Sequence, residues 1–371
     1  METKEIEITT DTLSNWLSEG RPVRIIDVRT KDQREEWAIP NSIHVDVYAR
    51  LKANDTTVFD FIHLPSNIPI VTVCGGGKMS LIAAEQLQQK GFEAFSLNGG
   101  MKAWNYAWNT ADINFPEKNL KVIQVRRSAK GCLSYIAGSA TEAIVIDASL
   151  DPSVYIELAK KNDWTIRYVM DTHIHADYIS RTSELAEATK VKHLFIKQAQ
   201  VNYPFTEVTH GDKFSFGNTS FEILHTPGHT WESTSYKIGN EVIFTGDTLF
   251  IDGVGRPDLK ASQEEAIIKA KQLFNTLKQL IKLPSNSLVL PAHTSMTVPF
   301  DAKPIAATLG TIVKNVKMLS LSETEFIEYT LTRIPPTPPN YLTIAALNKK
   351  GNHVASDRAG LEAGANRCAI A

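Results

Sequence analysis

The sequence has little cysteine and no long apolar run, and both shortages narrow its class. Cys74, Cys132 and Cys368 are the three cysteines among 371 residues, an odd and scattered set that cannot hold a fold of this size together through disulfides. No uninterrupted apolar run approaches the roughly 18 residues that span a bilayer, and the N-terminus lacks the basic start and apolar core of a signal peptide. We therefore expect a cytoplasmic protein with no membrane partner.

The chain also lacks an excess of charge of either sign. Its formal net charge is −2, with 39 lysines and arginines against 41 aspartates and glutamates. Because a protein without a broad positive field is poorly suited to hold nucleic acid, small molecules are the expected partners. Apolar residues make up 43% and charged residues 22% of the chain, which excludes wholesale disorder. At roughly 150 residues per domain, the length predicts two domains.

Residues 1–112 are predicted to form an α/β domain with a parallel sheet flanked by helices. Short apolar runs at 23–28, 68–73 and 94–97 predict strands. The apolar spacing of 81–90 predicts a helix directly after the second of these strands.

A linker is predicted over 113–118, where the periodicity is lost and a proline appears. The second domain, 119–371, again mixes strands and helices, and one helix is expected to begin at Pro152 with Asp151 as its N-cap. The clearest strand patterns lie at 120–127, 132–137 and 143–147.

The motif CGGGKMS begins at Cys74, between a predicted strand and a predicted helix N-terminus. Its glycines let backbone N–H groups converge on the sulfur position, and the helix dipole adds positive potential. Such a loop favours a nucleophilic thiolate. A buried cysteine beside an ordinary glycine turn is the alternative that these residues leave open. The loop consists of Gly75, Gly76, Gly77, Lys78 and Met79.

Three further motifs lie on either side of this loop in the sequence: IDVR at 26–29, EEWAIPNSIHV at 35–45 and LNGGMKAW at 97–104. Together they resemble a rhodanese domain. The resemblance implies that Cys74 accepts sulfur as a persulfide and passes it to a thiol or another acceptor. Many rhodaneses have an arginine late in the loop, where this sequence has Lys78 followed by Met79, so the preferred sulfur donor stays open.

The second domain places histidines and aspartates in four turns that each follow an apolar run. The turns are MDTHIHADY at 170–178, TPGHT at 226–230, FTGDTL at 244–249 and LPAHT at 290–294. Histidines and carboxylates on converging loops suit zinc or iron. Spacing alone does not decide whether His173 or His175 would bind the metal.

These motifs resemble the metallo-β-lactamase superfamily, which implies an αββα sandwich with a metal site at one edge of its paired sheets. Dinuclear hydrolases of this superfamily, such as glyoxalase II, carry a further histidine directly after the motif's aspartate, which is Asp177 here. This sequence has Tyr178 at that position, and a phenol is a poor substitute for imidazole in a dinuclear zinc site. We therefore expect one metal ion, with a merely packed Tyr178, which would leave the metal count open, as the alternative.

A finer resemblance rests on the first two turns, on FTGDTLFIDGVGRPD at 244–258 and on ANRCA at 365–369. These segments resemble the persulfide dioxygenase family. That family holds one Fe(II) through two histidines and one carboxylate and leaves a face open for a sulfur substrate and O₂. The resemblance assigns the iron ligands to His173, His229 and Asp247.

The same resemblance implies supporting roles for four neighbours of these ligands. His175, Asp177, Tyr178 and His293 would orient the ligands and hydrogen-bond substrate or oxygen. His175 and Asp177 are the two that we expect to take part in catalysis.

The roles of three further residues, Arg256, Cys368 and Cys132, are less sharply defined by the sequence. Arg256 matches a family arginine that would grip a substrate carboxylate, with an ion pair to Asp258 or Asp252 as the alternative. Cys368 would border the substrate channel or pack passively. Cys132 lies within an apolar run and is expected to be a small core residue.

Together the resemblances imply a bifunctional sulfur enzyme. The second domain would use O₂ to oxidise glutathione persulfide, or a similar small persulfide, to sulfite and thiol, and Cys74 would transfer sulfur between thiosulfate, sulfite and thiols such as glutathione. The direction of that transfer stays open. The alternatives are a glyoxalase II-like zinc thioester hydrolase, and a first domain that is an idle regulatory or interaction module. Family habit adds the expectation of a homodimer.

Overall fold

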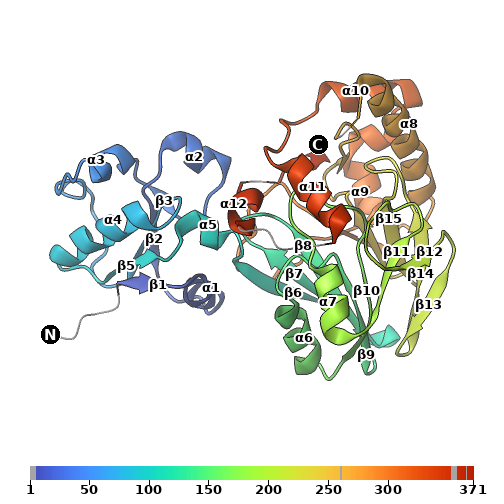
Figure 1. Ribbon diagram of the computed structural model, residues 1–371, viewed down its shortest axis with the longest axis horizontal. Helices are drawn as coiled ribbons and strands as arrows, with labels where there is room; N and C mark the ends of the chain where they lie inside the picture. The colour runs from blue at the N-terminus through green and yellow to red at the C-terminus, as the bar shows by residue number, and fades with distance from the viewer. Residues whose placement is uncertain (1–5, 260, 352–356, 365) are drawn as a thin grey trace.

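The computed structural model describes residues 6–259, 261–351, 357–364 and 366–371. The first residue of the 365–369 motif and the first five residues of the predicted N-terminal domain lie outside the described residues. Two domains follow one another along the chain and pack side by side (Figure 1). Within the described ranges, no helix combines the length and apolar character needed to cross a membrane.

The first domain is built on a parallel five-stranded sheet in the order β1-β5-β4-β2-β3. The strands are β1 (Glu7–Ile8), β2 (Arg24–Asp27), β3 (Ile43–His44), β4 (Ile70–Val73) and β5 (Ala94–Leu97). The helices are α1 (Thr10–Ser18), α2 (Lys31–Glu36), α3 (Tyr48–Lys52), α4 (Lys78–Gln89) and α5 (Gly100–Trp104). This confirms the predicted α/β class and places the cysteine loop between β4 and α4.

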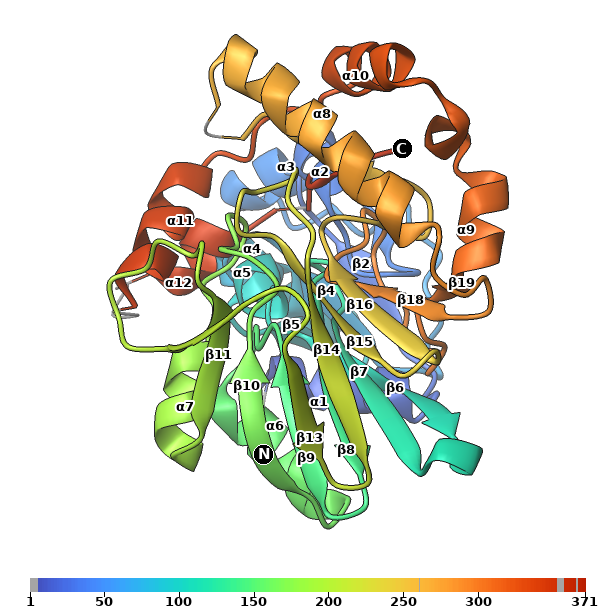
Figure 2. The same ribbon diagram turned by 90° about the vertical axis from the view of Figure 1, so that its right-hand side faces the viewer.

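Two larger sheets of the second domain face each other. One has the order β12-β11-β10-β9-β8-β7-β6, the other β13-β14-β15-β16-β18-β19 (Figure 2). The first contains β6 (Trp108–Phe115), β7 (Leu120–Arg127), β8 (Leu133–Ser139), β9 (Glu142–Ile146), β10 (Thr165–Met170), β11 (Lys192–Ile196) and β12 (Thr206–Val208). The second contains β13 (Lys213–Phe216), β14 (Thr219–His225), β15 (Thr234–Ile238), β16 (Val242–Gly246), β18 (Leu288–Pro291) and β19 (Ala307–Thr308), and β17 (Val254–Gly255) pairs separately with β20 (Ala369–Ile370).

Helices cover the outer faces of both sheets, which gives the predicted αββα sandwich. They are α6 (Pro152–Lys161) and α7 (Thr182–Thr189) on one sheet and α8 (Gln263–Leu280), α9 (Leu309–Asn315) and α10 (Glu323–Thr332) on the other (Figure 2). Helices α11 (Tyr341–Lys350) and α12 (Arg358–Glu362) follow, α12 in contact with α5 of the first domain, and 3₁₀ turns lie at Pro116–Lys118 and Lys317–Ser320. Ring contacts such as Tyr135 against Phe244 join the inner faces of the two sheets. As predicted, α6 begins at Pro152, and the Asp151 side chain accepts a hydrogen bond from the backbone N–H of Ser153.

The predicted linker at 113–118 is wrong, because these residues belong to a hairpin of the second domain. Strand β6 pairs along its whole length with β7, and the turn between them contains Pro116. Its inward positions are Asn109, Ala111 and Ile113. One of them is polar and one is small, so the period-two apolar signal of a strand is too weak to recognise.

Candidate functional site

Four loops at one edge of the paired sheets carry the predicted metal-binding side chains. The loops follow β10, β14, β16 and β18. The side chains of His173, His175, Asp177, His229, Asp247 and His293 are at most 4% exposed. Gly246, at the end of β16, has φ +53, and a Cβ there would lie 2.6 Å from Oγ1 of Thr172. Glycine at this position therefore lets the loop that carries Asp247 approach the loop that carries His173.

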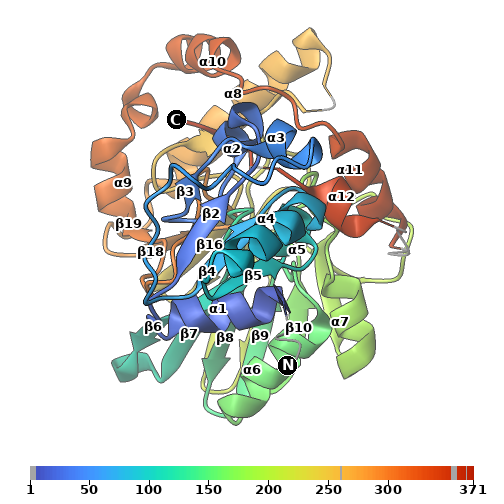
Figure 3. The same cartoon turned by 90° about the vertical axis from the view of Figure 1, so that its left-hand side faces the viewer.

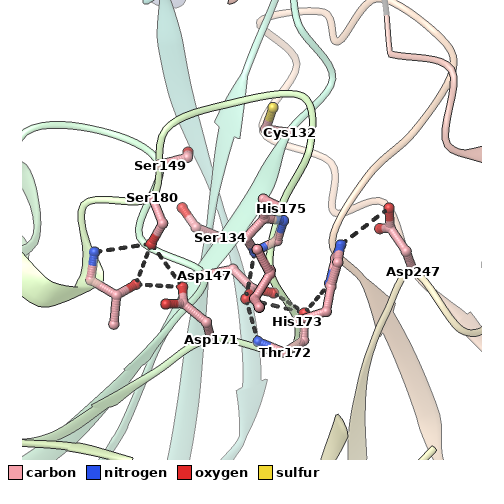
Figure 4. A network of polar contacts seen from close by, with 12 residues as sticks. Cys132, Ser134, Asp147, Ser149, Asp171, Thr172, His173, His175, Ser180 and Asp247 are labelled. Atoms are coloured by element: carbon pink, nitrogen blue, oxygen red, sulfur yellow. Dashed lines mark hydrogen bonds and ion pairs between the residues drawn. The ribbon is translucent and has the colours of Figure 1, made fainter. Parts of the chain in front are cut away.

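His173, His229 and Asp247 converge on one point. Nε2 of each histidine lies 3.7 Å from Oδ2 of Asp247, and His173 turns its ring toward Asp247 in Figure 4. One ligand atom from each residue lies within 4.8 Å of the other two. Oδ2 of Asp247 is buried without a hydrogen-bond partner, which is costly for a carboxylate oxygen that no cation binds.

The protein fixes both histidines so that Nε2 is the free nitrogen. Thr172 donates its hydroxyl proton to Asp147, and Oγ1 of Thr172 lies 2.9 Å from Nδ1 of His173, so it accepts the Nδ1 proton. Nδ1 of His229 lies 2.8 Å from the backbone oxygen of Arg256, which can only accept. Both Nε2 lone pairs are thereby available, as the outer partners of metal-binding histidines require. The three residues fit a metal ion.

Electrostatics also favours the protonation states that a metal needs. Burial lowers the pKa of His173 well below its ordinary value, with the nearby His175 imidazole as the next cause, and burial likewise lowers the pKa of His229. Burial alone would raise the pKa of Asp247, but the imidazoles of His293 and His173 hold it below the ordinary value. Two neutral imidazoles and one carboxylate are the deprotonated ligands that bind metal.

His293 bridges two carboxylates beside this site. Its Nδ1 lies 2.6 Å from Oδ1 of Asp247 and its Nε2 lies 3.0 Å from Oδ2 of Asp177. The same Asp177 oxygen accepts a hydrogen bond from the side-chain amide of Asn366 and lies 3.5 Å from Sγ of Cys132. His293 therefore occupies one oxygen of Asp247 and leaves Oδ2 facing His173 and His229.

His175 and Tyr178 form a separate layer that the loop folds back over Asp147. Nε2 of His175 lies 3.0 Å from Oδ1 of Asp147 (Figure 4), and the Tyr178 ring stacks on His175 with centroids 4.3 Å apart. The Tyr178 hydroxyl donates to the backbone oxygen of Asp147. Tyr178 is thus a buried packing residue that also holds the loop. It places a phenol, and not an imidazole, next to Asp177.

Arg256 differs from the prediction that it grips substrate. Its guanidinium is fully buried, pairs with both oxygens of Asp258 at 2.8 and 2.7 Å, and donates to the backbone oxygens of Pro336 and Arg367. The alternative interpretation, an ion pair with Asp258, is the one that the geometry supports. Arg256 serves the site through its backbone oxygen, which receives the proton of His229.

Two cysteines lie against the site. Cys368 has two interpretations from the sequence, a place at the substrate channel or passive packing, and its sulfur and the ligand atoms of Asp247 and His293 lie within 4.8 Å of one another. Cys132 does not behave as the plain core residue that its apolar run predicts, because its sulfur reaches Asp177 and His293 in the same way. Burial raises the pKa of both thiols. Cys132 lies directly before β8, where it pairs with His293 in an isolated β-bridge.

A cavity of about 220 Å³ opens beside His229. Its walls come from the loops of the metal site and from α8 and α11, and they include Trp231, Lys269 and Lys349. His229, one of the three converging residues, thus borders this cavity.

In the cysteine loop of the first domain, one backbone N–H and one hydroxyl reach the Cys74 sulfur. Sγ of Cys74 accepts hydrogen bonds from the backbone N–H of Gly77 at 3.2 Å and from the Ser80 hydroxyl at 3.4 Å. Gly77 has φ +94, in the left-handed region, so glycine permits the turn into α4. Lys78 is exposed and Met79 is buried beside Cys74 in the core, so neither offers a fixed cation to the sulfur.

Protein-family models match both halves of the chain. A Rhodanese-like domain matches residues 9–107, and the Metallo-beta-lactamase superfamily matches residues 127–293.

Individual relatives point to two activities. The mitochondrial persulfide dioxygenase ETHE1 of Mus musculus is 29% identical over 170 residues, which cover 44% of this chain and 65% of that protein. The hydroxyacylglutathione hydrolase of Brucella ovis is 32% identical over 184 residues, which cover 48% of this chain and 67% of that protein. The chain thus spans about two thirds of each relative.

Two solved structures align with this chain over about two thirds of its length. A metallo-beta-lactamase from Staphylococcus aureus aligns with a TM-score of 0.58 and 26% identity, covering 64% of this chain and 75% of that one. ETHE1 from Myxococcus xanthus aligns with a TM-score of 0.54 and 26% identity, covering 66% of this chain and all of that one.

The sandwich fold and its cluster of two histidines and one carboxylate define a metal-binding enzyme domain. The chain belongs to the metallo-beta-lactamase superfamily and carries a rhodanese-like domain ahead of that fold.

Proposed function

We propose that the second domain is a mononuclear iron persulfide dioxygenase and that the first domain is a sulfurtransferase. The observation that carries the proposal is the ligand set: His173, His229 and Asp247 converge on one point, while Tyr178 occupies the position where dinuclear hydrolases have another histidine. Two histidines and one carboxylate with open positions are typical of non-haem iron oxygenases. The relationship to ETHE1 proteins supports this choice.

In the proposed reaction, a small persulfide RSSH, O₂ and water give the thiol RSH, sulfite and two protons. Fe(II) bound by the three residues would supply a template and electrophilic activation for the terminal sulfur and for O₂. Thr172 and the backbone oxygen of Arg256 keep both imidazoles oriented, and His293 holds the second oxygen of Asp247. Because His173, His229 and Asp247 are at most 4% exposed, bulk water would have little access to a sulfur bound among them.

In the first domain, the Cys74 thiolate would attack the sulfane sulfur of thiosulfate and release sulfite, which leaves a persulfide on Cys74. The Gly77 N–H and the Ser80 hydroxyl are placed to hold the sulfur that carries the negative charge. Glutathione is the proposed thiol partner, and persulfide, thiosulfate and sulfite are the other small-molecule partners.

The decisive experiment measures metal content and O₂ uptake of protein purified without oxygen. We expect about one iron per chain, O₂ uptake that depends on added glutathione persulfide, and sulfite release. His229→Ala and Asp247→Ala should lose both iron and uptake, whereas Cys74→Ser should keep them. Two zinc ions per chain, no O₂ uptake and hydrolysis of S-lactoylglutathione would replace the dioxygenase with the thioester hydrolase.

A further inference from the structure

Three consecutive residues after α5 of the first domain hold the start of a loop of the second. The backbone oxygen of Asn105 accepts two hydrogen bonds from the guanidinium of Arg127, at 3.1 and 3.0 Å. The same guanidinium lies over the Tyr106 ring, with Cζ 4.8 Å from the ring centroid, and the backbone oxygen of Ala107 accepts the N–H of Ser128 at 2.8 Å. The first domain thus fixes the end of β7 and the first residue of the loop that follows it.

This loop, residues 128–132, runs from the domain interface to the metal site. Ala129 packs into an apolar cluster with residues of α5, and α5 lies on the side of the first domain that faces the second (Figure 1). At the other end of the loop, Cys132 pairs with His293 in a β-bridge. A Cβ at Gly131 would lie 2.3 Å from the backbone oxygen of the residue after His293, so the loop packs closely against the segment that carries this histidine.

His293 is the point at which this loop meets the candidate metal ligands. Its Nδ1 lies 2.6 Å from Oδ1 of Asp247, and the other oxygen of Asp247 faces His173 and His229. A residue that hydrogen-bonds a metal ligand sets the orientation of that ligand. A shift of the loop at the domain interface would therefore reach the carboxylate through His293.

A second connection runs through the C-terminal segment. A Cβ at Gly364 would lie 2.9 Å from Oε1 of Glu36 in the first domain, and Nη2 of Arg367 lies 3.6 Å from the same oxygen. Between these two positions of the segment, the side-chain amide of Asn366 donates to Asp177 of the metal-site cluster. Glu36 and Asp177 also line one small pocket together. Both domains therefore contribute to the surroundings of Asp177.

We infer that the first domain positions the metal ligands of the second, with Tyr106 as the positioning side chain of the first connection. Tyr106 keeps Arg127 in place and the loop 128–132 docked. His293 then holds Asp247 so that Oδ2 faces both Nε2 atoms. The inference depends neither on the identity of the metal nor on the reaction, because it concerns the protein ligands alone. By linkage, docking of the first domain and metal binding must strengthen each other by the same factor.

Binding of Co²⁺ to the metal-free, full-length chain tests this inference. The variant is Tyr106→Leu, which removes the ring beneath the guanidinium, and Tyr106→Phe keeps the ring and removes only the hydroxyl. The control is Phe92→Leu, which removes a half-buried ring from the other apolar cluster of the first domain. That cluster includes residues of α4, on the outer side of the domain (Figure 3). Urea unfolding checks that each variant is folded.

We expect Tyr106→Leu to raise the Kd for Co²⁺ about tenfold, the low end of the loss that follows removal of an outer partner of a metal ligand. The absorption bands of the bound Co²⁺, which report the ligand geometry, should change as well. Tyr106→Phe and Phe92→Leu should both match the wild type, and Co²⁺ should slow hydrogen exchange of the α5 amides in the wild-type chain. An unchanged Kd and spectrum in Tyr106→Leu, or an equal loss in Phe92→Leu, would overturn the inference.

If Tyr106→Leu does not fold, Glu36→Arg takes its place at the second connection, where it sets a cation against Arg367. Glu35→Arg, at an exposed position of the same helix, is its control. Weaker Co²⁺ binding in Glu36→Arg alone would support the inference, and equal binding in both variants would overturn it. Wild-type protein that binds no Co²⁺ would overturn it as well, whereas Co²⁺ binding without O₂ uptake by the iron-loaded protein would contradict only the dioxygenase proposal.

Discussion

Nη2 of Arg127 lies 2.8 Å from Oε2 of Glu362, and both side chains are buried to at least 98%. Arg127 also donates twice to the backbone oxygen of Asn105, at the end of α5 in the first domain. The other oxygen of Glu362 accepts the backbone N–H of Ile179, directly after Tyr178 in the metal-site loop. One ion pair thus connects the domain interface to the loop that carries His173.

Glu362→Ala should destabilise the protein by about 3–5 kcal/mol, the usual cost of leaving one partner of a buried ion pair without its counter-charge. Urea unfolding measures this loss. The control is Lys102→Ala, which removes a pair at the same interface whose side chains are more than half exposed and should cost at most about 1 kcal/mol. Equal losses in the two variants would show that the buried pair carries no special weight.

Asp247→Ala should abolish metal binding, because it removes the one carboxylate to which both Nε2 atoms point. Elemental analysis should show about one metal ion per wild-type chain and close to none in the variant. Metal added at a hundred times its dissociation constant should stabilise the metal-free wild type by about 2.7 kcal/mol and leave the variant unchanged. The control is Asp252→Ala, which removes an exposed carboxylate on the same loop. A similar loss of metal in this control would show that His173, His229 and Asp247 are not specifically the metal site.

Tyr178→His should raise the metal content from about one ion to about two per chain. The substitution supplies an imidazole next to Asp177 and near His293, and histidine and aspartate are ligand types of a second zinc site. Tyr178→Phe is the matched control, because it keeps the ring stacked on His175 and removes only the hydroxyl that donates to Asp147. One ion in the histidine variant would mean that Tyr178 is not what limits the metal count.

The sequence predicted the parts of the site that depend on where strands end. The bounds of β7 match the predicted strand 120–127, and the four turns after apolar runs do meet at one edge. Periodicity and turn residues are local, so they could be read from the chain without knowing its partners.

Contacts between distant segments could not be predicted in this way. The sequence leaves Arg256 with two roles, and its contacts to the backbone oxygens of Pro336 and Arg367, far along the chain, hold it in the ion pair with Asp258. Cys132 looked like a core residue because its partner His293 lies far along the chain. Asp147, which orders Thr172 and His175, gave no signal beyond its place at a strand end.

Gly100→Ala should impair sulfur transfer by Cys74 while the metal site keeps its activity. A Cβ at Gly100 would lie 2.3 Å from the backbone oxygen of Cys74 and 2.7 Å from the N atom of Gly77, and φ is +55. Relieving this clash has to move the Cys74 loop. A displacement of about 1 Å at a reacting group costs about a hundredfold in rate, which thiosulfate-to-glutathione transfer would register, while persulfide-dependent O₂ uptake reports on the second domain.

Gly20→Ala is the matched control for that substitution. Gly20 also has a positive φ, +68, but nothing lies within 4 Å of its added Cβ. It therefore shares the backbone strain of about 1–2 kcal/mol without the collision at the loop, and it should transfer sulfur at the wild-type rate. If both variants lose transfer alike, the loss comes from strain and general destabilisation, and the close packing of α5 against the Cys74 loop is not what holds the sulfur in place.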